Sequence, residues 1–319
     1  MHPFFLFFFW EHVADKSEYT NNSDFSEKYK YSHIPLLLFV VNSTSHHEEI
    51  KRTVRESYGK IWKTEGTCCT PSPVSVKVKR VSEYPVHEAL LNEIMPLEGK
   101  RILDVGCGNG NTVLRIAKQV GPDGKAVGID FSAEGIAKAK QKAIELGLDK
   151  VTEFRVADAE KLPFGDNYFD VVISECVVCL TPRKQKVLAE KTRVLKPGGK
   201  IVMHDVISKA CMPKAVQTNP ELYCACIGGA VSQSGYVKML KQAGLAEIKT
   251  VDCSEESATD NYPISLKRAL DSQILLAATN IEDEKDFQEI VKFVRNGGVG
   301  YALFVAKKPK LTSLKHQGN

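Results

Sequence analysis

The sequence lacks any hydrophobic run long enough to cross a bilayer. The apolar stretches Met1–Trp10 and Ile34–Val41 are far shorter than the roughly 20 residues that a membrane-spanning helix needs. The first stretch also has no basic segment before it and no small-residue cleavage site after it, so it is not a typical secretory signal. We therefore expect a cytoplasmic protein without stable membrane insertion.

The chain also has little net charge, at +4 over 319 residues. Its short basic runs, Lys77–Arg80 and Lys307–Lys310, contain no interleaved aromatic residues and are typical of solvated surface. We expect no nucleic-acid partner. Nine cysteines, an odd number, in a chain without a secretory signal favour a reducing compartment. There, thiols serve metal, metalloid or redox chemistry.

The chain contains no internal repeat and no long linker, and its composition divides it into segments. Residues 1–47 show no sustained period and predict a poorly ordered extension, whereas 48–85 predict a helix followed by a cysteine loop. We expect the ligand-binding core in 86–206. Further strands, an insertion and a substrate cap are expected in 207–310, and a tail in 311–319.

Strands and helices alternate through the predicted core. Apolar runs predict five strands, at 101–105, 125–130, 151–158, 169–176 and 200–206, with two later ones at 246–252 and 300–310. Helical patterns cover 111–120, 133–146 and 183–195, and the sequence Pro197-Gly198-Gly199 predicts a turn. This alternation predicts a doubly wound, mostly parallel α/β sheet of the Rossmann-like kind.

A glycine-rich loop follows the first predicted strand. Asp104 precedes Gly106, Gly108 and Gly110, and the loop leads into a helix. Glycines allow a tight turn and a close approach of backbone N–H groups to a ligand, and the helix N-terminus favours an anion. Alone, this pattern suits a dinucleotide-binding protein equally well.

Three further motifs narrow the choice. Asp130 ends the second strand, the sequence Val156-Ala157-Asp158-Ala159 ends the third, and RVLKPGG precedes the fifth. An acid at the end of the second strand can accept hydrogen bonds from both ribose hydroxyls. In this order and spacing, the motifs of residues 86–206 resemble the class I S-adenosylmethionine-dependent methyltransferases.

That resemblance implies a role for each cofactor residue. The three loop glycines should face the methionine part of S-adenosylmethionine, and Asp130 should hold the ribose. Phe131 should lie against the adenine, and Asp158, beside Ala159, should accept from the adenine amino group. Asp104 belongs to the same site and should satisfy N–H groups of the loop. Structural alternatives are a helix-capping role for Asp130 and a core position for Phe131.

Six cysteines fall into three segments that the predicted fold could bring together. They are Cys68 and Cys69 in the loop after the first helix, Cys176 and Cys179 after the fourth strand, and Cys224 and Cys226 in the insertion. Three thiolates suit a soft, thiophilic centre such as trivalent arsenic. Its lone pair can attack a sulfonium methyl group with no proton to remove, which leaves positioning and exclusion of water to the protein.

The same segments resemble the arsenite methyltransferase family over residues 50–245. The resemblance is carried by YGKIWKTEGTCC, ISECVVCLTP and ELYCACIGGAVSQSGYVKMLKQAGL. It implies that Cys69 (or its neighbour Cys68), Cys176 and Cys226 bind As(III). It also implies an external thiol reductant, thioredoxin or glutathione, as a partner.

The sequence departs from that family at two positions. Val113 stands where a cysteine of the disulfide relay is often found, and Glu175 stands where an Asn is common. We expect Cys68, Cys179 or Cys224 to supply the missing resolving thiol. Tyr58 either lines the substrate site or packs its helix, and His204 and Asp205 should border the cleft in supporting roles.

Alternative interpretations of the cysteines stay open. Cys107, Cys211 and Cys253 are expected to be small buried hydrophobes, and the six clustered thiols could instead hold structural zinc. The acceptor could be a small organic nucleophile rather than a metalloid. A non-catalytic protein that sequesters a metal or metalloid is the remaining alternative, although the intact glycine loop argues against it.

Overall fold

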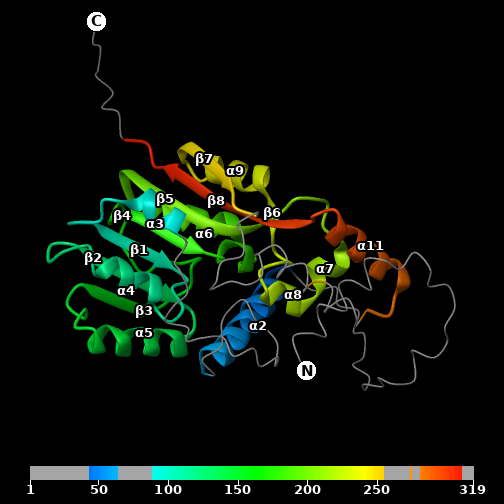
Figure 1. The fold of residues 1–319 in the computed structure, drawn as a ribbon, viewed down its shortest axis with the longest axis horizontal. Helices are drawn as coiled ribbons and strands as arrows, with labels where there is room; N and C mark the ends of the chain where they lie inside the picture. The colour runs from blue at the N-terminus through cyan, green and yellow to red at the C-terminus, as the bar shows by residue number, and fades with distance from the viewer. Residues whose placement is uncertain (1–42, 64–87, 255–273, 275–280, 311–319) are drawn as a thin grey trace, which may run out of the picture.

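A computed structural model describes residues 43–63, 88–254, 274 and 281–310. The core is a mostly parallel sheet with helices on both faces, as predicted (Figure 1). The strands are β1 (Arg101–Val105), β2 (Lys125–Asp130), β3 (Thr152–Val156), β4 (Phe169–Glu175), β5 (Leu195–Ser208), β6 (Val231–Ser232), β7 (Ala246–Asp252) and β8 (Val299–Lys307). Their order is β3-β2-β1-β4-β5-β8-β7, with β6 paired to the end of β5.

The central strands are buried on both faces, which explains their continuous apolar sequences. Ile102 of β1 faces one core and Leu103 faces the other. Three helices that cover the first core are α3 (Glu88–Ile94), α4 (Asn111–Ala117) and α5 (Ala133–Glu145). The second core is covered by α6 (Lys184–Val194) and α9 (Gln233–Gln242).

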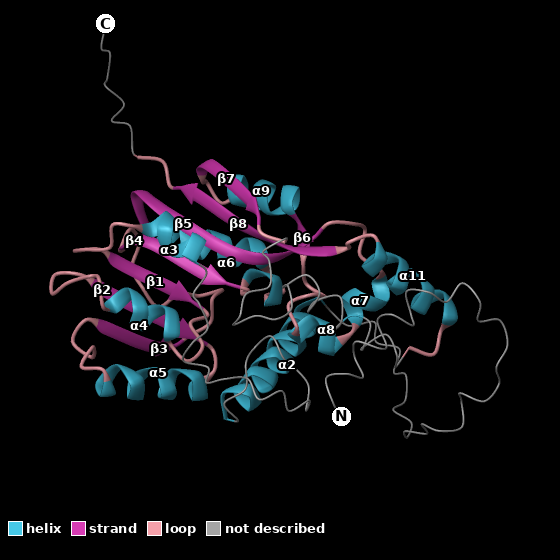
Figure 2. Cartoon of the chain, in the orientation of Figure 1, coloured by secondary structure: helices cyan, strands magenta, loops and turns pink. Residues whose placement is uncertain are grey.

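The remaining helical segments lie beyond the carboxyl ends of the parallel strands or at the far end of β5 (Figure 2). They are α2 (Ser43–Lys63), the short 3₁₀ turn η2 (Val178–Leu180), α7 (Lys214–Thr218), α8 (Pro220–Cys224) and α11 (Glu284–Arg295). Ligands of open α/β sheets bind at the carboxyl edge. The fold therefore brings α2, η2 and α8 to the edge where a ligand is expected.

Several local predictions differ from the structure. Helix α2 begins at Ser43, within the segment 1–47 that was predicted to be a poorly ordered extension. Pro197-Gly198-Gly199 lies inside β5 as an irregularity, because Leu195 pairs with Phe169 and Lys200 pairs with Val171. The short helix α3 was not predicted from the sequence. Among the residues that the structure describes, no helix combines the length and apolarity needed to cross a bilayer.

Candidate active site

The loop after β1 turns sharply at its three glycines. Gly106, Gly108 and Gly110 have positive φ angles of 81°, 52° and 79°. The Gly106 N–H donates to the Ile129 carbonyl oxygen of β2 at 2.7 Å. A Cβ atom at Gly108 would lie 2.5 Å from Cζ2 of Trp62. A larger residue there would have to displace the indole, so glycine is required by both conformation and space.

Asp130, the last residue of β2, ties this loop to the sheet. Its Oδ2 accepts from the Gly108 N–H at 2.9 Å and its Oδ1 accepts from the Ser132 N–H at 2.8 Å. Burial raises the pKa of Asp130, and the backbone donors oppose that rise. Each carboxylate oxygen keeps a second lone pair. Asp130 therefore fits the role of an acceptor for ribose hydroxyls.

Phe131, Asp158 and Ala159 lie at the same edge, after β2 and β3. The Asp158 Oδ2 accepts from Lys51 Nζ at 2.8 Å, and its Oδ1 accepts from the Glu160 N–H at 2.9 Å. Burial acts to raise the pKa of Asp158, but these donors outweigh it and the pKa is lowered. Lys51 also pairs with the Glu160 carboxylate at 2.7 Å. The expected adenine acceptor is thus already held by a cation from α2.

Helix α2 lies across the carboxyl ends of β2 and β3 (Figure 1). The Arg55 guanidinium carbon is 5.6 Å from the centre of the Phe131 ring. The Tyr58 hydroxyl lies 3.7 Å from Cys226 Sγ, and its side chain is also buried in the packing of the helix. The packing role considered for Tyr58 is therefore observed, and its role in the substrate site stays a prediction.

Cys176, Cys179 and Cys226 form a thiol cluster beside the glycine loop. Cys176 directly follows β4, Cys179 lies in η2, and Cys226 follows α8. Cys226 Sγ donates to the Cys176 carbonyl oxygen at 3.6 Å, and side-chain hydrogen bonds from Cys176 and Cys179 affect its pKa. A Cβ atom at Gly106 would lie 2.4 Å from Val177 Cγ2. The turn that carries Cys176 thus packs directly on the glycine loop.

The pKa values of the three cysteines are shifted in opposite directions. The pKa of Cys226 is lowered well below its ordinary value because Cys176, Cys179 and then the Tyr58 hydroxyl hydrogen-bond to it. The hydrogen bond to Cys226 raises the pKa of Cys176, and burial raises that of Cys179. Since the thiolate is the metal ligand and the nucleophile, a lowered pKa favours ligation by Cys226 over ligation by its two neighbours.

Two buried groups of opposite charge, Asp205 and Lys191, lie near the thiol cluster. The Asp205 Oδ2 accepts from the Val178 and Cys179 N–H groups at 3.0 and 3.3 Å. Lys191 is fully buried and its ammonium donates to the Ser174 hydroxyl. Burial raises the pKa of Asp205 to about 6 and lowers that of Lys191 to about 8, while their mutual attraction opposes both shifts. Asp205 thus fixes the η2 turn.

Asp104 and His204 occupy supporting positions. Asp104 is buried, and burial followed by repulsion from Glu175 raises its pKa well above the ordinary value. The His204 ring is buried and stacks on Tyr301, with 5.1 Å between the ring centres. Their burial agrees with the structural roles predicted for both.

The remaining cysteines include the predicted third thiolate ligand, Cys69 or its neighbour Cys68. Cys68 and Cys69 lie outside the described residues. Within the described ranges, no three His, Cys, Asp or Glu side chains are arranged to hold a metal ion, so a third ligand for Cys176 and Cys226 would come from elsewhere. Cys107 and Cys253 are buried as expected, but Cys211 is exposed, and that prediction is wrong because the residue lies in a loop before α7.

Three positioning residues were missed by sequence reasoning. Lys51 contacts Asp158, Trp62 contacts Gly108, and Lys191 lies beneath the thiol cluster. Lys51 and Lys191 look like surface lysines in the sequence. Trp62 follows the apolar period of its helix, and that period was the only available signal.

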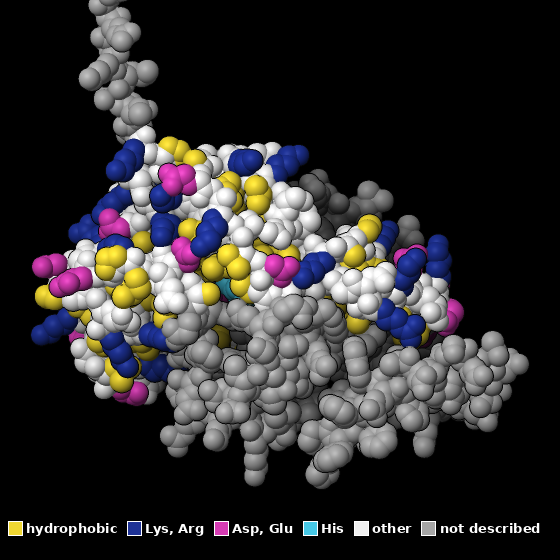
Figure 3. Space-filling view, turned by 45° about the horizontal axis from the view of Figure 1, so that its top comes forward, with side chains coloured by type: hydrophobic (Ala, Val, Ile, Leu, Met, Phe, Trp, Pro, Cys, Tyr) yellow, Lys and Arg dark blue, Asp and Glu magenta, His cyan; other side chains and the backbone are white. Residues whose placement is uncertain are grey.

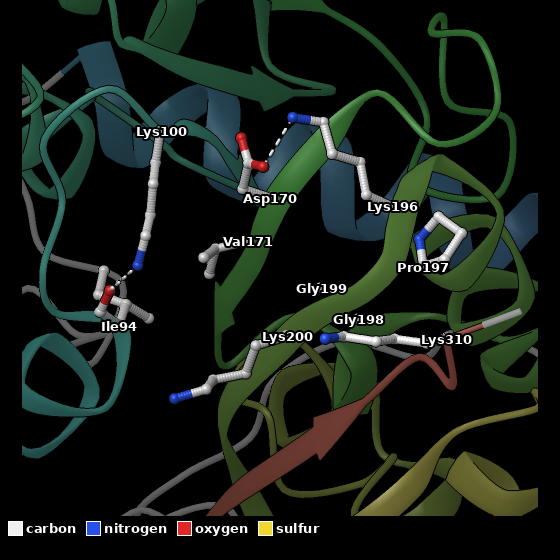
Figure 4. Close-up of a pocket in the computed structure, with 10 residues that line it drawn as sticks. All are labelled: Ile94, Lys100, Asp170, Val171, Lys196, Pro197, Gly198, Gly199, Lys200 and Lys310. Atoms are coloured by element: carbon white, nitrogen blue, oxygen red, sulfur yellow. Dashed lines mark hydrogen bonds and ion pairs between the residues drawn. The ribbon is translucent and has the colours of Figure 1, made fainter. Parts of the chain in front are cut away.

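A cavity of about 310 Å³ lies at the opposite, amino edge of the sheet. Its lysines are engaged locally: Lys196 pairs with Asp170 at 2.6 Å and Lys100 donates to the Ile94 carbonyl at 3.3 Å (Figure 4). On the described surface in view, basic and acidic side chains are interspersed (Figure 3). The candidate site is therefore the carboxyl edge.

Known proteins match the chain over this region. The family model for a methyltransferase domain matches residues 96–244. An arsenite methyltransferase of Halobacterium salinarum is 38% identical over 164 residues, which make up 51% of this chain and 42% of that protein. The chain spans about half the length of the curated arsenite methyltransferases that it matches, between 42% and 61% in three of them.

Methyltransferases of other substrates also match. Norajmaline N-methyltransferase of Rauvolfia serpentina is 30% identical over 216 residues, covering 63% of this chain and 71% of that protein. Among solved structures, geranyl diphosphate C-methyltransferase from Streptomyces coelicolor superposes with a TM-score of 0.54 at 17% identity. That superposition covers 80% of this chain and 98% of the other, and it agrees with the observed fold.

Proposed function

The chain belongs to the class I S-adenosylmethionine-dependent methyltransferases, and on that premise we propose that it moves methyl groups from S-adenosylmethionine to trivalent arsenic held by cysteine thiolates. The observation that carries the proposal is the meeting of Cys176 and Cys226 beside the glycine loop. Cys69, or its neighbour Cys68, is proposed as the third ligand. The arsenite methyltransferases among the relatives support the choice of acceptor.

The residues of the carboxyl edge fit the proposed methyl donor. S-adenosylmethionine, when bound, supplies an electrophilic methyl group. Asp130 would hold the ribose, and the backbone of the glycine loop would lie along the methionine part. Phe131, Asp158 and Ala159 would lie along the adenine. Helix α2 contacts these groups through Lys51 and Arg55.

The thiol cluster suits a soft acceptor better than a hard one. The lowered pKa of Cys226 favours the thiolate form, which is the form that ligates arsenic. Arsenic bound through sulfur keeps a lone pair, and attack by that pair on the methyl group forms an As–C bond with no general base. The task left to the protein is to hold the two reactants in line.

Cys179 is the candidate for the resolving thiol. Transfer of a methyl cation oxidises arsenic from the trivalent to the pentavalent state, and two thiols can return two electrons by forming a disulfide. Cys179 hydrogen-bonds to Cys226, whereas the side chain of Cys224 hydrogen-bonds to Ser57. We therefore favour a disulfide between Cys179 and Cys226, which an external thiol such as thioredoxin or glutathione would then reduce.

The test is methyl transfer from labelled S-adenosylmethionine to arsenite with excess thiol. Wild type should yield methylated arsenic, and both Cys176→Ser and Cys226→Ser should lose it while still binding cofactor. Cys211→Ser is the matched control, because Cys211 is exposed in a loop before α7 and should be dispensable.

A small organic acceptor is the second candidate, supported by the match to an N-methyltransferase. Methyl transfer to an organic nucleophile that survives Cys176→Ser would favour it. Tight arsenite binding without any cofactor binding would instead indicate a sequestering protein.

A further inference from the structure

Trp62 presents one edge of its indole to the glycine loop. A Cβ atom at Gly108 would lie 2.5 Å from Cζ2 and 3.3 Å from Cε2 of the indole, and one at Gly135 would lie 3.2 Å from Cδ1. These three ring atoms, with Nε1 between Cδ1 and Cε2, make up one continuous edge. The indole nitrogen therefore lies at the junction of the glycine loop and the first turn of α5, where a Cβ atom at Gly135 would lie 2.9 Å from the Gly108 carbonyl oxygen.

The nitrogen on that edge is an unsatisfied donor. Trp62 is 8% exposed, and its Nε1 is buried with no hydrogen-bond partner among the described residues. Buried indole N–H groups almost always have a partner, because leaving one unpaired in the interior is unfavourable. The acceptor that would satisfy Trp62 is therefore a group that the described residues do not supply.

The surroundings of Trp62 indicate what that group is. The same Gly108 whose Cα faces the indole donates its N–H to Asp130, and Gly135 is bound by the Ser132 cap that follows Asp130. Both glycines lack a side chain, which lets the indole edge approach their backbone. The donor thus faces the loop at which S-adenosylmethionine is expected to bind.

We propose that Trp62 is a cofactor-binding residue whose indole N–H donates a hydrogen bond to an oxygen of S-adenosylmethionine. The acceptor is either a ribose hydroxyl or the carboxylate of the methionine part. This inference rests on the proposed function for its ligand, but not on the identity of the methyl acceptor. Trp62 of α2 thereby joins the cofactor residues of the sheet.

The test compares Trp62→Phe with wild type in calorimetric titrations with S-adenosylhomocysteine and no arsenite. Phe keeps the apolar packing and removes the donor, so we expect affinity to fall about 10-fold. Lys63→Met, the exposed neighbour, is the matched control and should bind as wild type does. Adenosine separates the two acceptors: an equal loss for adenosine identifies the ribose, and a loss only for S-adenosylhomocysteine identifies the carboxylate.

A second measurement uses wild type alone, so it stands even where Trp62→Phe fails to fold. The chain has two tryptophans, Trp10 and Trp62, and the indole N–H signal of Trp62 in a ¹⁵N-labelled sample should shift downfield on binding. Unchanged or tighter binding by a folded Trp62→Phe, or an indole signal that does not move, would overturn the proposal. Failure of wild type to bind S-adenosylhomocysteine would overturn the proposed function and this inference together.

Discussion

Replacing Lys51 by Met should detach α2 from the carboxyl edge of the sheet. The Lys51 ammonium lies 2.7 Å from Glu160 and 2.8 Å from Asp158, and the Glu160 side chain is only 2% exposed. Removing one partner of a buried ion pair costs about 3–5 kcal/mol. Because Arg183 also pairs with Glu160 at 2.6 Å, we expect a smaller loss of about 2–3 kcal/mol.

The assay is thermal unfolding of the full chain, followed by circular dichroism. The expected loss corresponds to a fall in Tm of about 4–12 °C. The matched control is Lys63→Met on the same helix, where the pair with Glu134 spans 3.3 Å and the lysine is 67% exposed. An exposed pair is worth about 0–1 kcal/mol. The reasoning is refuted if Lys51→Met lowers Tm no further than Lys63→Met does.

Three other outcomes follow from the site. Gly108→Ala should lower Tm and weaken cofactor binding in calorimetry, because its Cβ would lie 2.5 Å from Trp62 at a φ of 52°; an unchanged affinity would contradict this. In peptide mapping after limited alkylation near neutral pH, Cys226 should react before Cys176 and Cys179, since only its pKa is lowered; earlier labelling of either neighbour counts against the thiolate assignment. Asp205 has a pKa raised to about 6, so the folded state keeps a proton that the unfolded state releases. Its contribution to stability is therefore present at low pH and lost as pH rises to about 6. The urea midpoint of wild type should fall over this pH range, and Asp205→Asn should remove that fall; the same pH dependence in wild type and variant would refute the reasoning.

Local sequence was sufficient for much of the sheet. The strands at 101–105 and 125–130 have the predicted bounds, because buried apolar runs end at a glycine or a charged residue. The strand at 246–252 also has the predicted bounds, although most of its side chains are exposed. Pro197-Gly198-Gly199 was expected to be a turn, but pairing of β5 with β4 on both sides of it keeps the chain extended. The antiparallel direction of β8 depends on partners distant in sequence, which a local pattern does not specify.

The candidate site was predictable where its residues belong to motifs, as the glycines, Asp130 and the cysteines do. Lys51 and Lys191 were not predictable, since a lysine in a helix is ordinarily solvated. Only the tertiary structure shows that acidic partners keep both in buried positions.

Helix α2 contacts both the expected cofactor residues and the thiol cluster. Lys51 holds Asp158 where the cofactor is expected, and about two turns later Tyr58 contacts Cys226 of the thiol cluster. A helix that shifts to release one contact also disturbs the other. A bound cofactor that displaces Lys51 should therefore change the affinity of Cys226 for its ligand. Thermodynamic linkage then requires that this ligand changes cofactor affinity by the same factor. The two binding events are therefore expected to be cooperative, with α2 as the element that couples them.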